Sequence, residues 1–124
     1  MKLCCALLIV LVFPLASATA QDDETKCCCT TYDTSVCLSK IHDGVEVQLD
    51  TTYKAVLEIA KGYTPEDVEN FKDAQQKWLV FRDAACKAEY GLWGKGSGGP
   101  NAHAMCIIRI TRGRIADLKV FREK

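Results

Sequence analysis

The chain has 124 residues, of which 48% are hydrophobic, and its 16 basic and 16 acidic side chains give a formal net charge of zero. This length is enough for one compact domain and leaves little room for a second. Because there is no basic excess, the composition argues against a nucleic-acid partner.

The N-terminus has the three parts of a secretory signal peptide. Lys2 precedes an apolar run over residues 3–16, and small residues follow up to Ala20, where we expect cleavage. The run is shorter than the roughly 20 residues that a membrane-spanning helix needs. We therefore expect residues 1–20 to be removed and residues 21–124 to form a single exported domain, periplasmic or secreted, with no stable membrane anchor.

Cysteine occurs eight times, and two of these residues lie in the signal segment. An even number of cysteines in an exported chain is typical of disulfides. The remaining cysteines are Cys27, Cys28, Cys29, Cys37, Cys86 and Cys106. Three adjacent cysteines cannot all reach one partner, so one of Cys27–Cys29 pairs unusually, stays free or bonds another chain. A metal site that combines them with Cys37 or His42 matches no zinc module, so we expect no metal and no cofactor.

From Asp33 onward the chain is compatible with a short helix, which we expect Gly44 to break or kink. A second amphipathic helix then runs to about Lys61. Its apolar positions recur at spacings of three and four and are Val45, Leu49, Tyr53, Val56, Leu57 and Ala60. The hydroxyl group of Tyr53 needs a partner on this face, and we expect Arg82 or Gln75 of the next helix to provide it.

The next helix begins at a strong signal. Thr64 is a capping residue, Pro65 suits the first helical position, and acidic residues follow where the helix dipole favours them. We expect this helix to end near Tyr90 or Gly91. One of its sides contains Val68, Phe71, Gln75, Trp78, Leu79, Arg82 and Cys86.

Gln75, Trp78 and Arg82 have two interpretations. In the first, they are core residues, with Arg82 reaching a carbonyl or carboxylate on a neighbouring helix while Trp78 fills the centre. In the second, they form a ligand or partner site, because Trp and Arg dominate binding hot spots when they are exposed together. We prefer the first, since an unpaired buried charge is costly and such a stripe demands specific neighbours.

Residues 91–101 are glycine-rich and predict a loop between two helices. A flexible connection is the simplest interpretation, and the segment lacks the ending of a nucleotide-binding loop. Large apolar side chains at Leu92 and Trp93 are nevertheless unusual on such a loop, and polar groups surround them. The candidate partner-binding residues are Trp93, Lys95, Ser97 and His103.

The last predicted helix runs from about Ala102 to Phe121. Its apolar side contains Ile107, Ile110, Thr111, Arg114, Leu118 and Phe121. We expect Arg114 to be a core residue that joins two helices by bonding backbone or an acidic residue such as Asp50, Asp83 or Glu89. Cys86 and Cys106, if joined, would tether both ends of the glycine-rich loop.

No catalytic arrangement is recognisable, because the two histidines are distant in sequence and no nucleophile motif is present. We therefore do not expect an enzyme. The expected fold is all-α, a small disulfide-stapled bundle of three to four helices.

Several motifs in order resemble the LprI-like lysozyme inhibitor family. They are Cys37, Leu49-Asp50-x-x-Tyr53, Gln75-x-x-Trp78-x-x-x-Arg82-Asp83-x-x-Cys86, the glycine-rich loop, Cys106 and Thr111-x-x-Arg114-x-x-x-Leu118. The chain departs from the family pattern at Asp50, where Asn is usual, and in its three adjacent cysteines.

The resemblance implies a small exported helical domain that binds and inhibits a lysozyme-type muramidase. Chemistry then favours loop 91–103 as the binding segment, because an inhibitor needs a protruding group to fill a groove that holds two carboxyl groups. The alternative is a periplasmic interaction or immunity protein for another exported partner, such as a wall-degrading toxin.

Overall fold

The computed structural model describes residues 30–93 and 96–122 as three long helices. Helix α1 spans Thr31–Ala60, α2 spans Pro65–Leu92 and α3 spans Gly99–Arg122. The predicted all-α fold is confirmed, with three helices and with a disulfide between Cys86 and Cys106. None of the helices within these ranges is long and apolar enough to cross a membrane.

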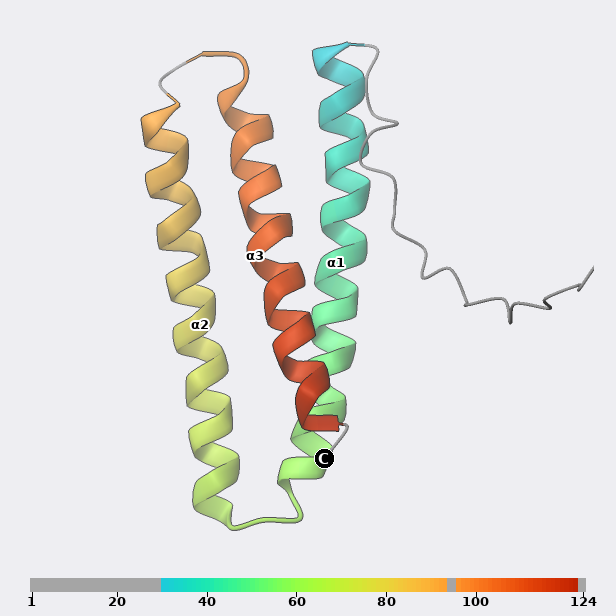
Figure 1. The fold of residues 1–124 in the computed structure, drawn as a ribbon, viewed down its shortest axis with the longest axis vertical. Helices are drawn as coiled ribbons and strands as arrows, with labels where there is room; N and C mark the ends of the chain where they lie inside the picture. The colour runs from blue at the N-terminus through green and yellow to red at the C-terminus, as the bar shows by residue number, and fades with distance from the viewer. Residues whose placement is uncertain (1–29, 94–95, 123–124) are drawn as a thin grey trace, which may run out of the picture.

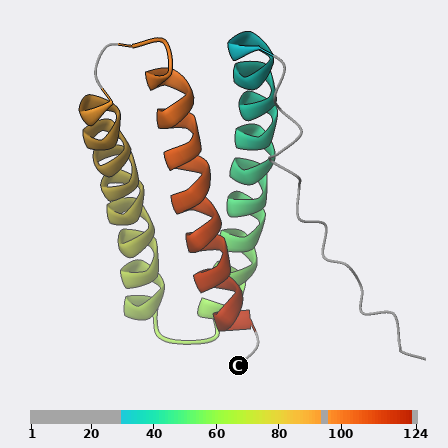
Figure 2. The same ribbon diagram turned by 45° about the horizontal axis from the view of Figure 1, so that its top comes forward.

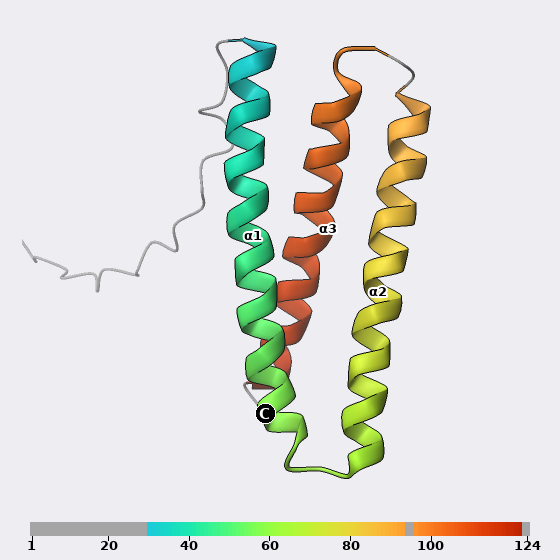
Figure 3. The same ribbon diagram turned by 180° about the vertical axis from the view of Figure 1, so that it is seen from behind.

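The helices run alternately up and down, and α3 lies between α1 and α2 in every view (Figures 1, 2 and 3). Helix α3 packs most extensively on α1 and then on α2, whereas α1 and α2 touch each other least. The end with the α2–α3 connection also holds the start of α1, and the opposite end holds the α1–α2 turn (Figure 1). Helix α2 therefore has a long side that faces away from the other two.

The core lies mainly between α1 and α3. Its fully buried residues are Leu38, Val45, Leu49, Val56, Ile108, Ile115 and Leu118. Burying each aliphatic side chain of this kind contributes roughly 1.5–3 kcal/mol. A smaller cluster of Cys86, Cys106 and Ile107 holds the ends of α2 and α3 together. The middle helix supplies buried residues to both clusters, which explains its central position.

Threonine caps begin α1 and α2. The Thr30 hydroxyl accepts a hydrogen bond from the backbone N–H of Asp33 at 3.0 Å. Thr64 and Asp67 form a reciprocal capping box, and Pro65 occupies the first helical position, as the sequence predicts. These side chains bond backbone N–H groups that would otherwise have no partner in the first turn.

The predicted break at Gly44 is wrong, because α1 runs through this position and spans 30 residues in all. A Cβ atom at position 44 would meet nothing within 4 Å, so the backbone does not need a glycine there. The cost of one glycine in a helix interior is about 1 kcal/mol, which the buried residues on both sides of it readily offset.

The glycine-rich connection is shorter than predicted, because α2 includes Gly91 and Leu92 and α3 already begins at Gly99. Pro100 lies in the first turn of α3, where its missing N–H costs nothing. The expectation that Phe121 lies on the covered side of α3 is also wrong, since this residue is 51% exposed.

Candidate functional site

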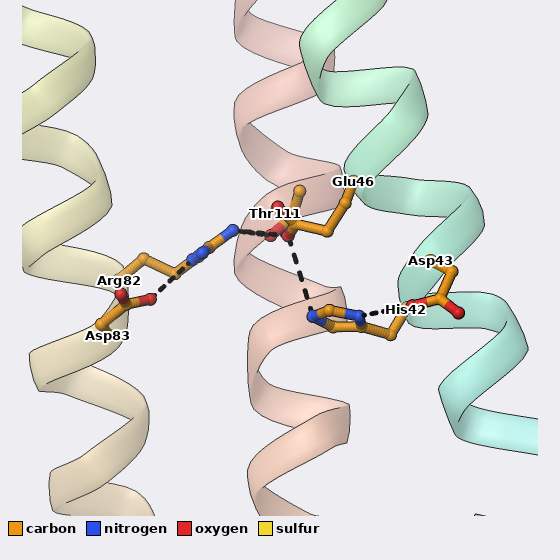
Figure 4. Close-up of polar contacts among 6 residues, drawn as sticks. All are labelled: His42, Asp43, Glu46, Arg82, Asp83 and Thr111. Atoms are coloured by element: carbon orange, nitrogen blue, oxygen red, sulfur yellow. Dashed lines mark hydrogen bonds and ion pairs between the residues drawn. The ribbon is translucent and has the colours of Figure 1, made fainter. Parts of the chain in front are cut away.

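Arg82 is at the centre of the polar contacts inside the bundle. Its guanidinium group bonds both other helices (Figure 4). Its Nη1 atom donates to Glu46 Oε1 of α1 at 2.6 Å and to the buried Thr111 Oγ1 of α3 at 3.1 Å. Its Nε atom donates to the neighbouring Asp83 at 3.0 Å. His42 completes the outer edge, 4.0 Å from Glu46. The buried guanidinium group thus bonds residues of all three helices through Nη1 and Nε.

Trp78 lies between two arginines. The guanidinium carbons of Arg82 and Arg114 are 5.4 and 5.7 Å from the indole centroid, within the range of cation–π attraction. Arg114 also donates from Nε to Gln75 Oε1 at 3.1 Å, which pairs the buried amide of Gln75. Burial lowers the pKa of Arg114, and the nearby carboxylate of Asp117 opposes that shift.

Two of the expected partners are wrong. Within residues 30–93 and 96–122, Arg82 bonds Glu46 and Thr111, Gln75 accepts from Arg114, and neither is bonded to the hydroxyl of Tyr53. The Tyr53 ring stacks on Phe71, with centroids 5.3 Å apart. Arg114 bonds Gln75, while the three acidic residues considered for it have other basic partners. Asp50 pairs with Lys54, Asp83 with Arg82 and Glu89 with Arg109. The central residues Gln75, Trp78, Arg82 and Arg114 thus lie together inside the bundle.

The other candidate region is the end of the bundle where α2 meets α3. The Cys86–Cys106 disulfide, with Cα atoms 5.5 Å apart, is fully covered and ties the two helices below their connection. Above it, the Tyr90 ring packs edge-on against His103, with centroids 6.1 Å apart and the rings nearly perpendicular. The connection between α2 and α3 is therefore anchored on both sides.

This end also contacts α1, because the Ser35 hydroxyl oxygen lies 2.8 Å from Asn101 Oδ1 of α3. Beyond these anchors, Leu92 is 89% exposed and Trp93 is 65% exposed. Ser97 is exposed as well, whereas His103 is half-buried within α3. The structure therefore places Trp93 and Ser97 on the connection and His103 at its base, while Lys95 lies outside the described residues.

A surface hollow of about 370 Å³ lies beside the disulfide, lined by Glu89, Met105, Cys106, Arg109 and Arg112. Arg109 Nη2 donates to Glu89 Oε2 at 2.8 Å, which neutralises both charges across α2 and α3. Sequence reasoning offered Glu89 only as a possible partner of Arg114, and it did not single out Arg109 or Glu46, the partner of Arg82. Both acids are ordinary surface positions in a helical pattern, so only the packing of the helices identifies the arginine that each one bonds.

No group of three His, Cys, Asp or Glu side chains that suits a metal ion exists within residues 30–93 and 96–122. Cys37 is disulfide-bonded. The expectation that one of Cys27–Cys29 pairs unusually, stays free or bonds another chain concerns residues that lie outside the described ranges.

One family model matches most of the chain. A family model described as lysozyme inhibitor LprI matches residues 20–118. An uncharacterised protein of Rhizobium meliloti (strain 1021) is 27% identical over 120 residues, which cover 87% of this chain and 86% of the relative. No solved structure matches the chain significantly. Since the family match covers well over half of the sequence, the protein belongs to the LprI lysozyme inhibitor family.

Proposed function

We propose that this protein is exported and binds a lysozyme-type muramidase, blocking the groove in which that enzyme holds its sugar substrate. The observation that carries the proposal is membership of the LprI family over residues 20–118. The predicted signal segment is consistent with it, because a muramidase acts outside the cytoplasm.

Within the chain, we propose segment 91–103 as the part that enters the groove. Lysozyme-type enzymes cleave with two carboxyl groups in a groove shaped for sugar rings, so an inhibitor needs a protruding aromatic group and nearby hydrogen-bond donors. Trp93 is a large exposed ring at the tip of the bundle, and Ser97 supplies a hydroxyl group on the same connection. Lys95 and His103 are the further candidates, Lys95 on its charge in the sequence alone.

The anchors below the connection support this assignment. The buried disulfide and the Tyr90–His103 contact hold the ends of α2 and α3 in place, so the helix end that carries Trp93 loses less conformational freedom on binding. A rigid end with an exposed Trp has the properties of an interface anchor, because Trp is enriched among the residues that dominate binding energy.

The test is the rate at which a muramidase clears a suspension of bacterial cell walls, measured with increasing amounts of the oxidised protein. We expect saturable inhibition near a one-to-one ratio and an at least tenfold weaker inhibitor after Trp93→Ala, the change expected for loss of a hot-spot aromatic residue. Tyr63→Ala is the matched control, because Tyr63 is 70% exposed at the opposite end of the bundle. Equal inhibition by the Trp93 and Tyr63 variants would remove the loop from the proposal.

A second candidate is binding of another exported protein, such as a wall-degrading toxin for which this protein provides immunity. The formal net charge of zero favours it, because a neutral protein gains little electrostatic attraction toward the basic lysozymes of animals. A panel of muramidases from animals and bacteria separates the two, since an immunity protein inhibits its own toxin and leaves animal lysozyme unaffected.

A further inference from the structure

Helix α2 has a second apolar face that does not belong to the core. In its C-terminal half, six small or apolar residues fall within roughly 120° of arc at 100° per residue, nearly opposite the buried Arg82 and Cys86. They are Val80, Phe81, Ala84, Ala88, Gly91 and Leu92. We call this surface the outer face of α2.

The outer face is exposed along its whole length. Val80 is 71% exposed, Phe81 60% and Leu92 89%, and the two alanines between them are exposed too. Helix α2 forms one side of the bundle, and neither other helix covers that side (Figures 1 and 3). Single exposed apolar residues are ordinary, but a continuous apolar strip of about three helical turns marks an interaction surface.

Gly91 gives this face an open position. A Cβ atom there would meet nothing within 4 Å, and the backbone is helical, so neither contacts nor conformation within the chain require a glycine. Glycine lowers the stability of a helix relative to alanine. Because nothing within the chain requires a glycine at position 91, its missing side chain leaves room for a bulky group from another molecule.

The face is complementary to itself in one antiparallel register. When two copies are related by a twofold axis at the level of residue 86, the same edges of the two strips meet, so Val80 of one copy faces Gly91 of the other, and Phe81 faces Leu92. Ala84 then faces Ala88 near the axis, where small side chains allow the two helices to approach closely. Val80 thus fills the open position at Gly91, and the apolar side chains of Phe81 and Leu92 cover each other.

The charges beside the face follow the same register. Asp83 and Lys87 lie along one edge of it, and an antiparallel twofold arrangement brings Asp83 of each copy within one turn of Lys87 of the other. Asp83 bonds Arg82 through Oδ1, but its side chain is 64% exposed and can accept a second cation from outside. Lys87 has no hydrogen-bond or ion-pair partner within the ranges that the structure describes. Two opposite-charge pairs would therefore form at the border of the interface.

We propose that the outer face of α2 binds a second copy of this chain, forming an antiparallel twofold dimer with Val80 packed over Gly91 of the other copy. The proposal does not rest on the muramidase assignment, because the outer face shares only Gly91 and Leu92 with segment 91–103 and contains none of the four loop candidates. Either can fail while the other holds.

The experiment is sedimentation equilibrium of the oxidised protein purified after secretion, over a range of concentrations, with a non-reducing gel to detect disulfide-linked chains. We expect a reversible, non-covalent monomer–dimer equilibrium. Ala84→Glu should weaken dimerisation at least about tenfold, because it brings like charges together near the axis. Ala74→Glu is the control, since this exposed alanine lies on α2 outside the overlap.

Gly91→Leu tests the register itself. It adds apolar surface, so a non-specific apolar patch would associate more strongly, whereas in the proposed dimer the new side chain collides with Val80 of the other copy and association weakens. A monomeric mass at every concentration up to the solubility limit overturns the proposal. So does a dimer that is covalent, that withstands Ala84→Glu, or that is strengthened by Gly91→Leu.

Discussion

Arg82 joins all three helices through one guanidinium group, and its energetic role differs from that of a surface ion pair. Its side chain is only 10% exposed and pairs with Glu46, whereas Arg109 is 64% exposed and pairs with Glu89. Removing Arg82 leaves Glu46 and the buried Thr111 hydroxyl without their donor. A charge whose partner is removed inside a protein is strongly destabilising, while exposed pairs contribute little.

We therefore predict that Arg82→Ala lowers the free energy of unfolding by about 3 kcal/mol. The matched variant Arg109→Ala, which also breaks an Arg–Glu pair between helices, should lower it by less than about 1 kcal/mol. Urea unfolding followed by circular dichroism measures both. Equal losses for the two variants would contradict the role assigned to Arg82.

The capping box at the start of α2 predicts a pH dependence. Hydrogen bonds from the Thr64 hydroxyl and backbone N–H hold the pKa of Asp67 below its ordinary value. Because the folded pKa is lower than the unfolded one, the cap stabilises the fold above the ordinary pKa, and this contribution is lost as the pH falls through the folded value.

The stability of Asp67→Asn should therefore fall less between neutral and acidic pH than that of the unaltered protein, as measured by urea midpoints across that range. Glu66→Gln is the control, since it removes a charge from the same turn and leaves the capping hydrogen bonds in place. A profile for Asp67→Asn that matches the unaltered protein would exclude a capping role for the ionised carboxylate.

At the scale of the helices, Gly44 is a test of why α1 does not break. Position 44 is exposed and helical, and an added Cβ meets nothing within 4 Å. Gly44→Ala should therefore raise the free energy of unfolding by about 0.5–1 kcal/mol, because alanine loses less backbone entropy in a helix. A destabilised variant in thermal or urea unfolding would mean that α1 needs a bend at this point.

The disulfide is the main covalent support of the α2–α3 end. It closes a loop with a sequence separation of 20 residues, and both half-cystines are covered. The chain-entropy account gives about 3 kcal/mol for a loop of this size. The double variant Cys86→Ala, Cys106→Ala should lose that amount in urea unfolding. A loss below about 1 kcal/mol would show that helix packing alone holds this end.

Sequence reasoning located the helices where local chemistry is decisive and missed features that depend on packing. The Thr64 cap, Pro65 and the three-and-four spacing around Trp78 predict α2 well, because caps and periodicity act within a few residues. The expectation of a break at Gly44 was wrong because the helix propensity of a single residue contributes less free energy than the burial of the apolar side chains around it. The link between Arg114 and Gln75 joins residues far apart in sequence, and helical spacing gives no information on which helix faces which.

The candidate site was likewise predictable only in part. The sequence singled out the large apolar residues on the α2–α3 connection, and Trp93 is exposed in the structure. The outer face of α2 was not foreseen, because its residues occupy the side opposite the stripe that the periodicity selected. A sequence pattern identifies one buried side of a helix readily, but only the arrangement of all three helices shows which second side remains uncovered.

For the whole molecule, we propose a helical wedge whose tip, at the α2–α3 end, enters the groove of a muramidase. The most direct measurement is calorimetric titration of a muramidase with the oxidised protein, in the absence and in the presence of a saturating chito-oligosaccharide that occupies the groove. We predict one-to-one binding of the protein to the muramidase. The saccharide should abolish this binding or weaken it in proportion to the saccharide's own affinity for the groove. Binding of equal strength with the groove filled, or no binding to any muramidase tested, would contradict it.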